Sequence, residues 1–176
     1  MKTKELTLIA ICTSLMAVLS PMSIPLVGGV PISLATFVVM LVAMILNTKD
    51  ACITVCLYII LAFIGVPVLS GYRSGASVLF GMTGGYIFGY IPLAIFTSWL
   101  KDIKTGNKYL KIALPFLGMI IGTIILYAMG TMWFMYFTGK DLTSSLYACV
   151  IPFIPGDIIK IAIVSIIAPR LVKFIK

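Results

Sequence analysis

Six apolar stretches follow one another along this chain with few charges between them, and they restrict it to a small set of folds. Hydrophobic residues make up 61% of the 176 residues and charged residues 10%, whereas soluble domains have about 25% charged residues. So few charged side chains cannot cover the surface of a soluble globular domain. The composition therefore predicts an integral protein of the cell membrane, with a single domain over residues 1–176. The stretches are Leu6–Ser20, Ile32–Leu46, Ala51–Val66, Gly84–Leu100, Ile112–Phe137 and Ile154–Ile175.

The lengths of these stretches indicate an all-α bundle of six transmembrane helices. Crossing the hydrocarbon core takes roughly 20 helical residues, and several stretches are shorter. The short ones must borrow flanking residues, or end in loops that are buried against neighbouring helices.

Lysine and arginine in the short loops predict the orientation, because such residues gather on the cytoplasmic side. If the N-terminus is cytoplasmic, most cations fall on the inner side. The inner set is Lys2, Lys4, Lys49, Lys101, Lys104, Lys108, Lys111, Arg170, Lys173 and Lys176. The outer set is Arg73 and Lys140, with Lys160 near a helix start. We therefore predict that both termini are cytoplasmic.

This topology places three irregular segments on the outer side: Pro21–Pro31, Pro67–Thr83 and the turn Pro152–Gly156. Arg73 lies within Pro67–Thr83, and Asp157 and Lys160 follow directly after Pro152–Gly156. Together they predict a pocket that opens outward.

Asp157 and Lys160 are an acid and a base within an apolar segment, where a charge costs roughly 2.5–3.5 kcal/mol at a membrane centre. One interpretation is structural: Asp157 favours the positive end of its helix, and Lys160 is its salt-bridge partner. That interpretation explains Lys160 poorly, because a cation in the first turn opposes the helix dipole. The other interpretation, which we favour, is that both residues bind a ligand.

The outer loop adds Tyr72 and Arg73, and Tyr86 follows a glycine-rich stretch. An arginine offers a planar fork that suits a carboxylate. We consider these three residues as ligand-binding candidates, beside the alternative of a solvated loop with interfacial tyrosines.

Other features restrict the chemistry to binding. The chain has no phosphate-binding loop of the Gly-x-x-x-x-Gly-Lys-[Ser/Thr] type and no histidine, so ATP hydrolysis by that loop and histidine-based catalysis are excluded. Cys52 and Cys56 could hold half a metal site, but no second pair accompanies them, and packing in a helix interface is favoured. We expect no catalytic residue, no metal and no cofactor.

Small residues at helical spacing occur in the first segment, at Ala10 and Ser14. Such spacing lets helices approach closely in lipid. A docking surface for another membrane protein and ordinary packing both explain it.

Four motifs stand out along the chain: Pro31-Ile32-Ser33-Leu34, Gly65-Val66-Pro67-Val68, Gly81-Met82-Thr83-Gly84-Gly85-Tyr86 and Pro152-Phe153-Ile154-Pro155-Gly156-Asp157-Ile158-Ile159-Lys160. Taken together, they resemble the BioY family, the biotin-specific substrate-binding (S) subunits of energy-coupling-factor (ECF) transporters. The resemblance extends over essentially the whole chain.

The resemblance implies a six-helix membrane protein that takes up biotin together with a transmembrane coupling subunit and two ATPase subunits. It implies that Asp157 and Lys160 contact the bicyclic head of the ligand. It also implies that Ala10 and Ser14 face the coupling subunit.

The chain departs from the family pattern at four positions. It has Ala35 where relatives often have Gln, Arg73 where Asn is common, Met82 in place of Pro, and Ile87 where some relatives have Arg. Arg73 could replace the lost Arg as the carboxylate partner. A related ligand, lipoate or a biotin precursor, is the nearest alternative, and a membrane enzyme or a structural membrane protein is a weaker one.

Overall fold

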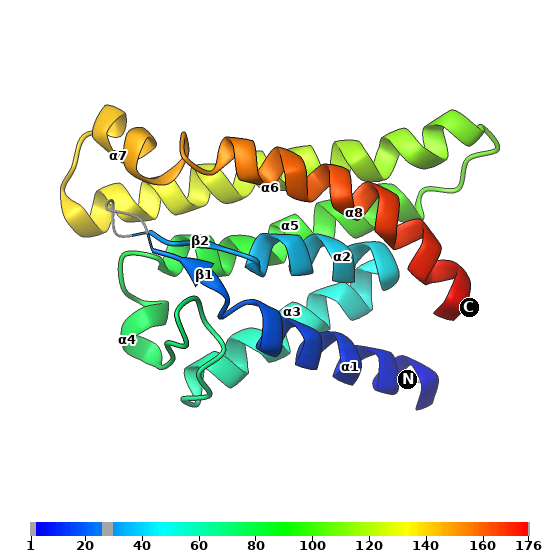
Figure 1. The fold of residues 1–176 in the computed structure, drawn as a ribbon, viewed down its shortest axis with the longest axis horizontal. Coiled ribbons are helices and arrows are strands. Elements are labelled where there is room, and N and C mark those ends of the chain that lie inside the picture. The colour runs from blue at the N-terminus through cyan, green and yellow to red at the C-terminus, as the bar shows by residue number, and fades with distance from the viewer. Residues whose placement is uncertain (1–2, 26–29, 176) are drawn as a thin grey trace.

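The chain folds into a bundle of long helices with a small hairpin at one end (Figure 1). The computed structural model describes residues 3–25 and 30–175. Part of the segment Pro21–Pro31, together with Lys2 and Lys176, lies outside these ranges. The elements are α1 (Thr3–Leu19), β1 (Ser23–Ile24), β2 (Ile32–Ser33), α2 (Ala35–Ile45), α3 (Thr48–Phe63), α4 (Ala76–Leu79), α5 (Gly84–Asp102), α6 (Lys108–Thr138), α7 (Leu142–Cys149) and α8 (Ile154–Ile175).

The six apolar stretches correspond to α1, α2, α3, α5, α6 and α8, which confirms the mostly helical fold. The structure adds three short elements that the apolar pattern does not predict. One is the antiparallel pairing of β1 with β2, in which Ser23 pairs with Ser33, so the protein is not purely α-helical. The other two are α4 and α7. Asp141 caps α7, and hydrogen bonds from Ser144 lower the pKa of its exposed carboxyl group, so the cap is charged at neutral pH.

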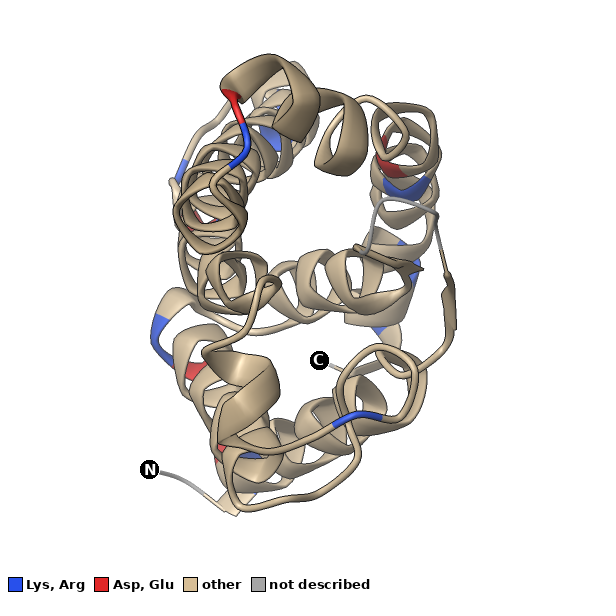
Figure 2. Cartoon of the chain, turned by 90° about the vertical axis from the view of Figure 1, so that its left-hand side faces the viewer, with Lys and Arg blue, Asp and Glu red and all other residues tan. Residues whose placement is uncertain are grey.

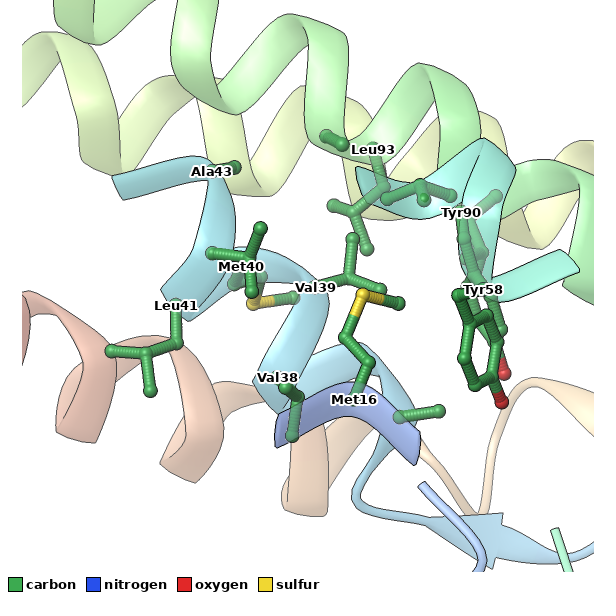
Figure 3. Close-up of a cluster of buried hydrophobic side chains, with 14 of the residues drawn as sticks. Met16, Val38, Val39, Met40, Leu41, Ala43, Tyr58, Tyr90 and Leu93 are labelled. Carbon is green, nitrogen blue, oxygen red and sulfur yellow. The ribbon is translucent and has the colours of Figure 1, made fainter. Parts of the chain in front are cut away.

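Helix α2 lies in the centre of the bundle and packs against α1, α3, α5 and α8. Most of its residues are buried, as expected for a helix that is apolar on all sides. Figure 3 shows the cluster around it, in which Val39 of α2 lies with Met16 of α1 and Leu93 of α5. The rings of Tyr58 and Tyr90 lie beside this cluster, with centroids 6.5 Å apart.

Helices α5 and α6 form the most extensive helix pair. They pack closely because glycines stand where they meet. A methyl group at Gly118 would lie 2.7 Å from the backbone oxygen of Phe96, so no larger residue fits without a shift. Gly118 thus serves packing within the protein, as small residues do between membrane helices.

Apolar side chains also cover much of the outside of the bundle, and charged residues are sparse on the ribbon (Figure 2). Within the described residues, α6 is long and apolar enough to cross a membrane by itself. Helices α7 and α8 are separated by a short break, at which the direction of the chain bends by 47°. If these two helices are counted as one membrane segment, they form a second span. The remaining helices are shorter or less apolar, as the lengths of the apolar stretches predicted.

The beginning of α1 and the end of α8 lie at the same end of the bundle, and the hairpin, α4 and α7 lie at the other (Figure 1). At the terminal end, α5 binds the turn between α2 and α3. The Lys101 ammonium donates to the backbone oxygens of Ala43, at 2.9 Å, and Leu46. Asp102 accepts from the Thr48 backbone N–H at 3.1 Å. A cation thus meets the C-terminus of α2 and an anion the N-terminus of α3, as helix dipoles favour.

Candidate functional site

A cleft opens among the elements at the end of the bundle opposite the termini. It has about 630 Å³ of empty space, which includes its open mouth. Its wall comes from α2, α3, α4, α5, α6 and α8, from β2, and from the segment before α4. Apolar and aromatic side chains form most of this wall, and a few charged groups lie among them, which is typical of small-molecule sites.

Asp157 lies in the first turn of α8 and is 5% exposed. Its Oδ1 accepts hydrogen bonds from the Lys160 ammonium at 2.9 Å and from the Thr36 hydroxyl at 3.1 Å. Its Oδ2 accepts from the Tyr127 hydroxyl at 2.6 Å. The carboxylate therefore joins α8 to α2 and α6, and its charge is compensated within the protein.

The Lys160 ammonium is fully engaged as well. It donates to the Ser33 backbone oxygen at 2.7 Å, to Thr36 Oγ1 at 3.0 Å and to Asp157 Oδ1. A lysine ammonium has three N–H donors, and here each has an acceptor. The salt bridge expected from the structural interpretation is therefore present, and it belongs to a network that also lines the cleft.

Arg73 is exposed and lines the same cleft. Its Nε donates to the Ser70 backbone oxygen at 3.1 Å. Among the described residues, no carboxylate lies within ion-pair distance of Arg73. Among the lining residues that the structure describes, the cleft thus has a buried acid–base pair and one further cation, which suits a ligand with a single negative charge.

The two tyrosines predicted from the sequence lie in different places. Tyr86 lines the cleft, and its hydroxyl donates to the Cys149 backbone oxygen at 2.9 Å. Tyr72 is 67% exposed, has a positive φ of 59°, and is not among the described residues that line the cleft. A role for either residue in ligand binding stays a prediction.

Three polar residues of the network were missed in the sequence: Ser33, Thr36 and Tyr127. Ser33 belongs to a family motif, but Lys160 donates to its backbone oxygen, which any residue type would supply. Thr36 is separated from Asp157 by 121 positions, so no local spacing could reveal their contact. Tyr127 did offer a signal, because a tyrosine hydroxyl inside an apolar helix needs a hydrogen-bond partner.

The positions that depart from the family pattern are also placed by the structure. Ile87 and Arg73 both line the cleft, so an apolar side chain stands at one position and a cation at the other. Ala35 is 1% exposed and packs in the core. Met82 is partly exposed and lies outside the lining residues that the structure describes.

Ala10 and Ser14 are exposed along α1, on the outside of the bundle. Cys52 and Cys56 of α3 are free thiols, and the described part of the chain holds no group of three potential metal ligands among His, Cys, Asp and Glu.

This fold and this cleft define a helical, multi-pass membrane protein with a cleft at one end whose mostly apolar wall carries a few charged groups. The family model described as the BioY family matches residues 1–176. The chain belongs to the BioY family.

The sequences of individual relatives align with this chain over nearly the whole length of both. The chain is 38% identical over 173 residues to "Biotin transporter BioY2" of Lactococcus lactis subsp. cremoris, covering 98% of this chain and 92% of the relative. It is 35% identical over 171 residues to "Biotin transporter BioY" of Thermotoga maritima, covering 97% and 96%. A crystal structure described as the S-component for biotin from an ECF-type ABC transporter superposes with a TM-score of 0.84 at 30% identity. That match covers 98% of this chain and 95% of the other. These relatives are described as transporters or transporter components and not as enzymes.

Proposed function

We propose that this chain binds biotin and mediates its uptake as the substrate-specific subunit of an ECF-type transporter. The observation that supports this best is the arrangement of the charged side chains on the wall of the cleft. The buried pair of Asp157 and Lys160 lies on one part of the wall, and Arg73 lies exposed on another.

Biotin matches this arrangement in its chemistry. Its ureido ring has N–H donors, which suit the acceptors of the network around Asp157. Its carbonyl would accept from Lys160 in exchange for one of the three protein partners of that ammonium. Its apolar chain suits the wall formed by residues such as Leu126 and Phe153, and its carboxylate suits Arg73. Arginine is well suited to a carboxylate because its fork makes two parallel hydrogen bonds.

Lipoate and a biotin precursor are the alternative ligands. A precursor that retains the ureido ring fits the same groups as biotin. Lipoate has the carboxylate but no N–H donor in its ring, so it would leave the polar network without a ligand partner. The network is satisfied within the protein, so lipoate would leave its groups paired but would forgo the hydrogen bonds that biotin gains there, and its binding would be weaker.

The orientation and the partners are part of the same proposal. We propose cytoplasmic termini, because the lysines and arginines of the described chain concentrate at the terminal end of the bundle. They lie at the start of α1, in the turn between α2 and α3, between α5 and α6, and at the end of α8. We also propose that a transmembrane coupling subunit binds at Ala10 and Ser14 and that two ATPase subunits supply the energy.

Isothermal titration of the purified protein with biotin, dethiobiotin and lipoate tests the ligand. We expect tight binding of biotin, weaker binding of dethiobiotin, and no measurable binding of lipoate at the same concentrations. Tight binding of lipoate with no heat from biotin would replace the proposed ligand by its rival.

Arg73→Ala tests the position of the ligand carboxylate. We expect about tenfold weaker biotin binding, which corresponds to 1.4 kcal/mol, because a charge-assisted pair at the mouth of the cleft is lost. Biotin methyl ester has no carboxylate charge, so its affinity for the wild-type protein and for Arg73→Ala should be equal. If the variant weakens both ligands to the same extent, Arg73 shapes the cleft without binding the carboxylate.

A further inference from the structure

In the polar network of the cleft, the hydroxyl oxygen of Tyr127 keeps acceptor capacity that no hydrogen bond among the described residues uses. All three N–H groups of the Lys160 ammonium donate to protein acceptors. Oδ1 of Asp157 already accepts two hydrogen bonds, and the residue is only 5% exposed. Tyr127 lines the cleft, and the structure records one hydrogen bond from its hydroxyl, to Asp157 Oδ2.

The direction of that hydrogen bond fixes what Tyr127 can offer a ligand. An ionised carboxylate can only accept hydrogen bonds, so the Tyr127 O–H is the donor. Its proton is therefore directed at Asp157 and is not available to a ligand. The phenol oxygen keeps its lone pairs, so toward the cleft it can act only as an acceptor. A ligand group that binds there must therefore be an N–H or O–H donor.

Asp157 makes this acceptor stronger than an ordinary phenol. The 2.6 Å distance from Tyr127 Oη to Asp157 Oδ2 lies within the range of charge-assisted O–H···O⁻ bonds. A hydroxyl that donates to a charged acceptor becomes more polarised, and a chain of such bonds is cooperatively strengthened. The negative charge of Asp157 is thus extended to an atom on the cleft wall.

We infer that Tyr127 is a specificity-determining ligand contact whose oxygen accepts a hydrogen bond from one N–H of the ligand. This inference rests on the proposed function, and within it the N–H belongs to the ureido ring of biotin. Asp157 then acts on that N–H partly through Tyr127.

A comparison of two proteins and three ligands tests the contact. The proteins are the wild type and Tyr127→Phe, and the ligands are biotin and the two cyclic carbamate analogues in which oxygen replaces one or the other ureido N–H. We expect Tyr127→Phe to bind biotin about tenfold more weakly than the wild type does. One analogue should bind the wild type about tenfold more weakly than biotin does, and Tyr127→Phe should not weaken it further. Such a cycle isolates the contact from other effects of the substitution.

Tyr136→Phe is the matched control, because Tyr136 lies on the same helix and is 90% exposed. Wild-type affinity of Tyr127→Phe for biotin would overturn the inference, and so would equal weakening of biotin and both analogues, which indicates a structural role. If Tyr127→Phe fails to fold, equal binding of biotin and both analogues to the wild type overturns the inference. A wild-type protein that binds no biotin refutes the proposed function itself, so the two failures are distinguishable.

Discussion

At the scale of single residues, the pair of Asp157 and Lys160 has both a structural and a binding role. The side chains are 6% and 12% exposed, and their partners come from α2, α6 and the strand before α2. A buried ion pair that loses one member leaves an uncompensated charge, and this costs more than the loss of both members.

Lys160→Met should therefore lower the free energy of unfolding by about 3 kcal/mol. The double variant Asp157→Asn Lys160→Met should recover at least half of that loss, because no isolated charge remains. Thermal unfolding in detergent measures stability, and titration should show that both variants lose biotin binding. Lys173→Met, on the exposed end of α8, is the control. A double variant no more stable than Lys160→Met would show that the buried charge is not the cause.

The sequence made these two residues visible because charges are rare in apolar segments. Thr36 gave no such signal, and the hydroxyl of Tyr127 indicated only that it needs a hydrogen-bond partner, without identifying that partner. Their contacts with Asp157 depend on how α2, α6 and α8 pack. Hydrophobicity along the chain does not contain that information.

At the scale of elements, the long helices were predictable and the short ones were not. A run of apolar residues determines a membrane helix almost by itself, because the backbone must satisfy its own hydrogen bonds in lipid. Helix α7 and the hairpin of β1 and β2 are short, and tertiary contacts hold them. One such contact is the hydrogen bond from Tyr86 to the Cys149 backbone oxygen at the end of α7.

Gly130 on α6 determines where Tyr86 lies. A methyl group at Gly130 would come within 2.3 Å of the Tyr86 ring, so Gly130→Ala should push the ring toward the cleft and break its hydrogen bond to Cys149. We expect the free energy of unfolding to fall by about 1–3 kcal/mol and biotin affinity to fall at least tenfold. Calorimetry and thermal unfolding check both quantities. Gly106→Ala is the control, because nothing lies within 4 Å of a methyl group there. If Gly130→Ala and Gly106→Ala have the same stability and the same biotin affinity, Gly130 does not determine the position of Tyr86.

At the scale of the whole molecule, the cleft and the proposed partner surface lie on different elements. The cleft lies at the end with the hairpin, α4 and α7, and its wall includes no residue of α1 among those that the structure describes. Ala10 and Ser14 are exposed along α1. Ligand binding and assembly with partner subunits can therefore be altered separately.

Ala10→Trp is expected to separate these two activities. A large ring at this position would keep a partner helix from the close approach that small residues permit. The isolated variant should bind biotin with wild-type affinity, because α1 does not line the cleft. The same variant should fail to copurify with the coupling and ATPase subunits and should not support biotin uptake by cells. Ala162→Trp is the matched control, since Ala162 is an exposed alanine on α8. If Ala10→Trp assembles and transports as well as Ala162→Trp does, the partner binds elsewhere on the bundle and Ala10 is an ordinary lipid-facing residue.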